Sequence, residues 1–175
     1  MTVAYRAGVA AATILAWGGL RFAPVDPIPF PRDYRLWAHV KTAIVGPQSD
    51  AFATEGGIHH VYANDEAVEG YLSGEFPDGS ILVYDLLETS LVRGNTVEGK
   101  ERRVDVMVKR SAKYPDTGGW GFASFAPGSR EPGEARSDCF GCHQREGRDH
   151  VFSEFRSIEG LSDTTTTRAP GSRPR

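Results

Sequence analysis

Apolar and polar positions alternate with a period of two along several short stretches of the chain. The clearest stretch is 104–109 (VDVMVK), in which three valines alternate with Asp, Met and Lys. Successive side chains of a strand point to opposite faces, so this pattern predicts a half-buried strand with the valines on one face. Lys109 falls on the other face and is expected to meet solvent. Further strands are expected at 36–45, which is rich in apolar and β-branched residues, and at 57–62, 80–87 and 119–125.

A helix is predicted between the stretches at 57–62 and 80–87. Asn64 can act as its N-cap, and the acidic side chains that follow lie in the first turn, where the helix dipole favours them. Gly74 is placed to end the helix. The tripeptide Pro-Asp-Gly at 77–79 then forms a turn, because proline presets one φ and glycine accepts a positive one.

These elements predict an α+β domain, mainly an antiparallel β-sheet with a few short helices. Residues 24–32 contain four prolines and are expected to form a stiff extended linker. The folded domain is therefore expected over 33–160. The end of the chain, 161–175, has almost no apolar residues and is expected to be disordered.

Residues 1–23 have the layout of an export signal. Arg6 precedes an uncharged run at 7–20 (AGVAAATILAWGGL), and a positive start followed by about 7–15 apolar residues is typical of a secretory signal peptide. The run is shorter than the roughly 20 residues that a transmembrane helix needs. The candidate cleavage residue Ala23 is followed by proline, so the segment can instead stay as an uncleaved membrane anchor. Both of these predict a periplasmic protein. The third alternative, a buried helix of the folded domain, is disfavoured because the proline-rich stretch that follows detaches the run from the domain.

Composition and charge narrow the class only slightly. Of the 175 residues, 39% are hydrophobic and 25% are charged, which is ordinary for a soluble globular protein. The net charge is −3, and it leaves no basic surface of the kind that nucleic-acid binding requires. A nucleic-acid partner is therefore not expected.

The cysteine content is more informative, because the only two cysteines belong to one pentapeptide, CFGCH. Cys-x-x-Cys-His is the attachment signature of c-type haem. Two residues between the thiols let one turn of backbone reach both haem vinyl groups as thioethers, and the adjacent histidine then lies under the iron. We expect one covalent haem c, attached through Cys139 and Cys142, with His143 as an iron ligand. The attachment site should lie on a short C-terminal helix that Ser137 or Asp138 can cap.

Three other uses of the cysteine pair compete with this interpretation. A disulfide between Cys139 and Cys142 suits an oxidising compartment but leaves the adjacent histidine unexplained. A thioredoxin-like redox pair needs a βαβ context, which this segment lacks. Zinc needs a fourth ligand, which another histidine could supply. The adjacent histidine and the export signal together favour haem.

The remaining histidines are His39, His59, His60 and His150. His39 and His150 receive no assignment from the sequence. Neighbouring residues of a strand point to opposite faces, so one of His59 and His60 should face the interior. That side chain could enter a haem pocket.

Several stretches, in a fixed order, resemble the cytochrome P-460 / cytochrome c′-beta family of small mono-haem proteins. They are LWAHV at 36–40, GIHHVY at 57–62, GEFPDG at 74–79, GGWGF at 118–122, the haem motif, and DHVF at 149–152. The resemblance implies a homodimer built on antiparallel sheets, with a haem iron bound by histidine on one side and open to small ligands on the other. It also implies two kinds of activity. Members with a lysine cross-linked to the haem oxidise hydroxylamine, whereas c′-beta members bind nitric oxide and carbon monoxide without that link.

The sequence departs from the cross-linked members at the position of that lysine, which aligns with Tyr84. Their pocket arginine aligns with His59, which favours His59 over His60 as a pocket residue. Their acidic proton-relay residue is matched by Glu146, with a spacing that differs by one residue. The resemblance therefore implies His59, Tyr84 and Glu146 as distal, or catalytic, candidates.

Together these observations predict a periplasmic c-type haem protein whose open iron site binds a small gaseous or nitrogenous ligand, such as nitric oxide or carbon monoxide. Two alternatives stay open, and with them the question of whether the protein is an enzyme. One is a haem enzyme that oxidises hydroxylamine or nitric oxide, or acts as a peroxidase. The other is an electron-transfer cytochrome whose iron is closed by a second ligand. His59 could be that ligand, and Met107 is the only methionine of the predicted domain.

Overall fold

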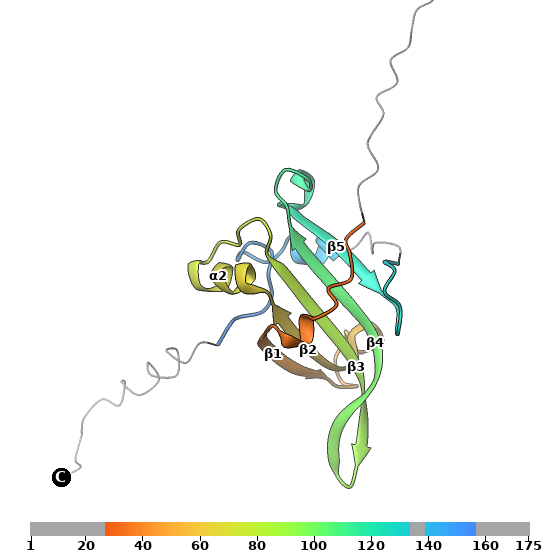
Figure 1. The fold of residues 1–175 in the computed structure, drawn as a ribbon. Helices are drawn as coiled ribbons and strands as arrows, with labels where there is room; N and C mark the ends of the chain where they lie inside the picture. Colours follow the sequence, from red (N-terminus) through yellow and green to blue (C-terminus); the bar gives the residue numbers. More distant parts are fainter. Residues whose placement is uncertain (1–26, 134–138, 157–175) are drawn as a thin grey trace, which may run out of the picture.

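The computed structural model describes residues 27–133 and 139–156. Within these residues, five strands form one antiparallel sheet in the order β1-β2-β3-β4-β5 (Figure 1). The strands are β1 (Ala38–Val45), β2 (Gly57–Ala63), β3 (Ile81–Val92), β4 (Asn95–Lys109) and β5 (Trp120–Phe125). Each strand pairs with its neighbours along the chain. The predicted α+β class, with a mainly antiparallel sheet, is confirmed.

Short helices connect and follow the strands. They are the 3₁₀ helices η1 (Tyr34–Leu36) and η2 (Pro115–Thr117) and the α-helices α1 (Phe52–Glu55), α2 (Asp65–Ser73) and α3 (Cys139–His143). Helix α2 begins and ends as predicted. The Asn64 side chain accepts a hydrogen bond from the backbone N–H of Ala67 at 3.1 Å, and Gly74 ends the helix with a φ of +89°. The predicted C-terminal helix is present as α3, whereas its expected caps, Ser137 and Asp138, lie outside the described residues.

One face of the sheet, called here the N-terminal face, is covered by the segment that precedes β1. Its buried cluster contains the three valines that the alternation places together. The cluster consists of Ile28, Phe30, Tyr34, Val83, Val104, Val106, Val108, Ala123 and Phe125. Ile28 and Phe30 come from the segment 24–32 that was expected to be a linker, so packing against the sheet starts before residue 33. The outer limits of the domain stay predictions.

The opposite face, called here the C-terminal face, is covered by α2 and by residues 139–156. In Figure 1 this last segment lies behind the sheet, on the side away from the N-terminal segment. Its buried cluster consists of Val40, Val61, Ala63, Ala67, Phe76, Leu82, Met107, Trp120 and Val151. The haem motif therefore lies on the face that the three valines of β4 do not use.

Strands β3 and β4 extend further than predicted, as a long hairpin that projects from the sheet (Figure 1). Arg93 and Gly94 form its turn, with φ values of +51° and +82°. Nothing in the described residues covers its end, where the Leu91 side chain is 77% exposed. Because neither face of this extension is buried, its sequence lacks the alternation by which the other strands are predicted.

Both predicted extensions of the chain lie outside the described residues. These are the export signal or anchor within 1–23 and the disordered tail at 161–175. Within the part that the structure describes, no helix is long and apolar enough to cross a membrane.

Candidate haem site

His143 is the last residue of α3, and its ring is held on several sides. Its Nδ1 lies 2.8 Å from the carbonyl oxygen of His150, and because a carbonyl only accepts, Nδ1 carries the ring proton. The rings of Phe122 and Phe152 pack against it, with centroid distances of 5.3 and 4.7 Å. Burial lowers the pKa of His143, although the hydrogen bond to His150 acts in the opposite direction. The ring is thus neutral with an unprotonated Nε2, the form in which histidine binds a metal.

The two cysteines lie on the same short helix as His143. Cys139 is half-buried and Cys142 is exposed, and their separation of three residues makes them neighbours on one helical turn. Between them, the ring of Phe140 lies 6.5 Å from that of Phe122 on β5 and 5.3 Å from that of His150. These contacts dock the whole motif on the C-terminal face.

His59 and Tyr84 lie on the same C-terminal face, on β2 and β3. Val61 pairs with Tyr84, and the rings of Tyr84 and His59 stack with their centroids 4.6 Å apart. Nδ1 of His59 is buried and has no hydrogen-bond partner among the described residues. Burial lowers the pKa of His59. Near neutral pH, the ring is therefore uncharged and keeps a polar nitrogen that no described protein group satisfies.

His60 points to the N-terminal face instead. Its Nδ1 lies 2.8 Å from Oγ1 of Thr42, and its Nε2 lies 2.8 Å from the carboxylate of Glu98. Its ring lies 6.0 Å from that of His39. Of the two adjacent histidines, His59 is the one on the face that carries His143, while the roles of both stay predictions.

A polar network that the sequence did not predict surrounds Tyr84. Its hydroxyl is hydrogen-bonded to the carboxylate of Glu55, and burial, followed by the charge of Glu55, raises the pKa of Tyr84 above its ordinary value. The hydroxyl therefore keeps its proton and donates a hydrogen bond to the carboxylate. Arg103 pairs with Glu55 and, at 2.6 Å, with Asp105, and its guanidinium lies 5.8 Å from the centre of the Tyr84 ring. Asp105 in turn accepts a hydrogen bond from Ser124 at 2.6 Å.

The third distal candidate, Glu146, belongs to a different segment from the other two. It follows α3, where its backbone N–H donates to the carbonyl of His143 at 3.0 Å. His59 and Tyr84 lie on β2 and β3. The structure thus brings two of the three candidates into contact and places the third beside the haem motif.

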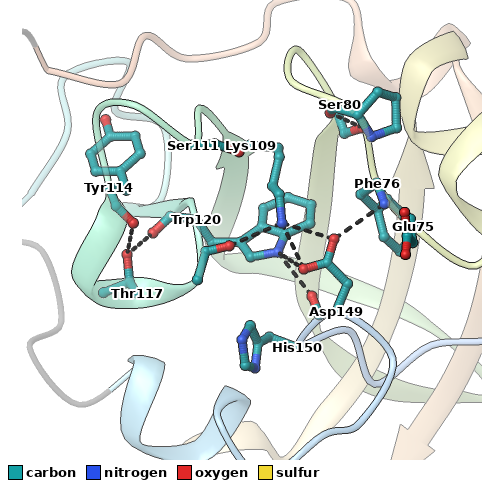
Figure 2. Close-up of polar contacts among 12 residues, drawn as sticks. Glu75, Phe76, Ser80, Lys109, Ser111, Tyr114, Thr117, Trp120, Asp149 and His150 are labelled. Carbon is teal, nitrogen blue, oxygen red and sulfur yellow. Dashed lines mark hydrogen bonds and ion pairs between the residues drawn. The ribbon is translucent and has the colours of Figure 1, made fainter.

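The expectation that Lys109 meets solvent is wrong. Its side chain does lie on the face away from the valines, but Lys109 is only 7% exposed, because the C-terminal segment covers this end of the sheet. Its Nζ donates to the carbonyl of Gly118 at 2.9 Å and to the two carboxylate oxygens of Asp149 at 2.6 and 2.8 Å (Figure 2). In the sequence, Asp149 stands out only as part of the resemblance, and no local pattern indicates this ion pair.

The chain matches the family model of cytochrome P460 over residues 31–153, which is well over half of its 175 residues. The chain therefore belongs to the cytochrome P460 family, as the resemblance implies. Membership of this family makes the chain a haem protein. A comparison with curated proteins finds no match.

The residues on the C-terminal face fit a haem. His143 presents an unprotonated nitrogen that is oriented by a backbone hydrogen bond, which is the usual arrangement of a metal-binding histidine. Both cysteines lie on the same helical turn, and His59 has a buried nitrogen without a partner in the described part of the chain. When bound, a haem supplies an iron ion that can ligate small molecules or transfer electrons.

The lowered pKa of His59 predicts how stability depends on pH. Its pKa lies below the ordinary value of 6.5, so as the pH falls below about 6.5 the unfolded chain binds a proton that the folded chain does not. The contribution of His59 to the free energy of unfolding should therefore be complete above this pH and decrease as the pH is lowered further. Urea unfolding of the haem-loaded protein at about pH 8 and about pH 5 measures this loss. The free energy of unfolding of His59→Gln should fall less between the two pH values than that of the wild type. The exposed control His39→Gln should show the same fall as the wild type. Equal losses in all three proteins would contradict the prediction.

Proposed function

We propose that this chain carries one covalent haem c, attached through Cys139 and Cys142, with Nε2 of His143 as an iron ligand. The other side of the iron is open and binds a small ligand such as nitric oxide or carbon monoxide. The observation that carries this proposal is the hydrogen bond from His143 Nδ1 to the carbonyl of His150, on the helix that holds both cysteines. Such a bond sets both the tautomer and the ring orientation of a metal-binding histidine.

In this proposal, His59 and Tyr84 border the ligand side. The unsatisfied Nδ1 of His59 offers a hydrogen-bonding group to a bound ligand. Met107, which an electron-transfer site could use to close the iron, is 9% exposed and pairs in register with Leu82 and Phe122 inside the hydrophobic cluster. Its place in the core supports an open iron over a site closed by methionine.

The test uses protein made with a c-type maturation system. We expect the intact mass to exceed that of the polypeptide by one haem, acid–acetone to leave the haem attached, and carbon monoxide to bind the ferrous protein. Extractable haem, or no haem, would contradict the attachment. A low-spin ferrous spectrum that does not change when carbon monoxide is added would favour the electron carrier. If His59→Ala then allowed carbon monoxide to bind, His59 would be the second ligand.

One observation favours a second candidate, an enzyme that oxidises hydroxylamine. The Tyr84 hydroxyl donates a hydrogen bond to Glu55, so its oxygen is left to accept a hydrogen bond from a ligand. Hydroxylamine carries hydrogens for such a bond, and Glu55 could take up the proton, whereas nitric oxide and carbon monoxide have none. Turnover of hydroxylamine by the wild type that is lost in Glu55→Gln would support the enzyme. If the wild type does not turn over hydroxylamine, the proposal of a binding protein stands.

Export and self-association complete the proposal. The apolar run at 7–20 supports a periplasmic protein with either a cleaved signal or a membrane anchor, and the family resemblance supports a homodimer. Cell fractionation would separate soluble periplasmic protein from anchored protein, and light scattering would give the mass of the assembly.

A further inference from the structure

We propose that Lys109 and Asp149 form a positioning pair for the iron ligand. They hold the backbone turn that contains His150, so that the carbonyl of His150 accepts the Nδ1 proton of His143. This inference rests on the proposed function, in which His143 binds the iron. It assigns a role to two residues outside the haem motif and outside the set of distal candidates.

Asp149 is fixed to the sheet by its side chain and by its backbone. Its carboxylate accepts from Lys109 at 2.6 and 2.8 Å and from the backbone N–H of Phe76 at 3.1 Å (Figure 2). Its backbone carbonyl accepts from Nε1 of Trp120 at 2.9 Å. Lys109 Nζ also lies 5.1 Å from the centre of the Trp120 ring. The ends of β4 and β5 and the loop after α2 thus converge on this one residue.

The turn that follows has a backbone conformation that needs such support. Asp149 and His150 have φ values of +48° and +65°, a left-handed region that costs residues other than glycine free energy and persists only where the surroundings hold it. The backbone N–H of Val151 closes the turn onto the carbonyl of Arg148 at 3.0 Å. Within this turn the carbonyl of His150 reaches Nδ1 of His143 at 2.8 Å.

Gly118 links the ion pair to the other side of the turn. Its carbonyl accepts from Lys109 at 2.9 Å, and its φ is +63°. A side chain at this position would collide with the ring of His150, which lies next to Gly118 in the packed structure. Gly118 therefore accepts a hydrogen bond from the Lys109 ammonium group and, because it has no side chain, leaves room for the His150 ring.

Loss of the pair should act on the iron through His143. The hydrogen bond at Nδ1 makes the imidazole a stronger electron donor, and such outer contacts tune a metal site. Without the ion pair, either a buried charge is left unpaired or the turn loses its anchor. The carbonyl of His150 would then move away from Nδ1, and the bond between iron and histidine would weaken.

The experiment is resonance Raman spectroscopy of the ferrous, haem-loaded full-length protein. We expect Asp149→Asn to shift the iron–histidine stretching band to lower frequency and to make the midpoint potential more positive. A second variant, Lys109→Met with Asp149→Asn, leaves no buried charge unpaired and should fold even where the single variant does not. It should show a shift in the same direction.

The matched control lies one residue away. Arg148→Ala breaks an exposed ion pair with Glu154 at 3.0 Å, in the same segment, and should leave the band where it is in the wild type. An unchanged band in the folded Asp149 variants would overturn this inference but not the proposed function. A wild-type protein without covalent haem, or without an iron–histidine band, would overturn the proposed function and this inference with it.

Discussion

His143→Gly is expected to remove the axial ligand while the haem stays attached through Cys139 and Cys142. The imidazole ring packs between Phe122 and Phe152, so its removal leaves a cavity with aromatic walls and an unpaired carbonyl at His150. The iron–histidine stretching band of the ferrous protein should disappear. Free imidazole can refill this cavity and repeat the lost hydrogen bond, so its addition should restore the band.

A methylated ligand tests the hydrogen bond itself. Because 1-methylimidazole cannot donate to the carbonyl of His150, it should bind His143→Gly more weakly than imidazole, by roughly 2- to 10-fold for one hydrogen bond. The control His39→Gly replaces an exposed histidine that contacts Thr42 and His60, and it should keep the wild-type band. Equal binding of the two imidazoles, or an unchanged band in His143→Gly, would contradict the assigned ligand.

The parts of the fold that could be predicted depend on local chemistry. Asn64 caps α2 and Gly74 ends it because each acts on the backbone beside it. The alternation at 104–109 predicts a strand because neighbouring side chains point to opposite faces, although the structure covers both faces here and the strand is not half-buried. The haem motif can also be recognised from the sequence, because its two cysteines and its histidine lie within five consecutive residues.

The parts that could not be predicted depend on residues far apart in the chain. Lys109 is buried because Asp149, forty positions later, returns to the end of β4. Glu55 lies on a helix of four residues, too short to give a periodic pattern, yet it meets Arg103 and Tyr84 across the sheet. Alternation could place Arg103 on the correct face, but it could not identify its partner.

Peptide mapping should find the haem bonded to Cys139 and Cys142 and to no third side chain. A link to Lys109 needs a lone pair on its nitrogen. As an ammonium group, however, Nζ has three N–H donors, and three acceptor oxygens of Gly118 and Asp149 lie within 2.9 Å of it. The reduced absorption spectrum should therefore be that of an ordinary c-type haem, with little turnover of hydroxylamine.

The resemblance aligns Tyr84 with the family's cross-linking lysine, and the surroundings of Tyr84 also oppose a link. Its hydroxyl is bound to Glu55 and its pKa is raised by burial, so the nucleophilic phenolate is disfavoured near neutral pH. Tyr84→Phe should consequently give the same haem-peptide map and the same reduced spectrum as the wild type. A third bond that disappears in Tyr84→Phe, or one that maps to Lys109, would contradict the prediction. If hydroxylamine oxidation were found as well, the chain would be an enzyme. The resemblance implies that a third haem bond distinguishes the members that oxidise hydroxylamine from those that only bind gases.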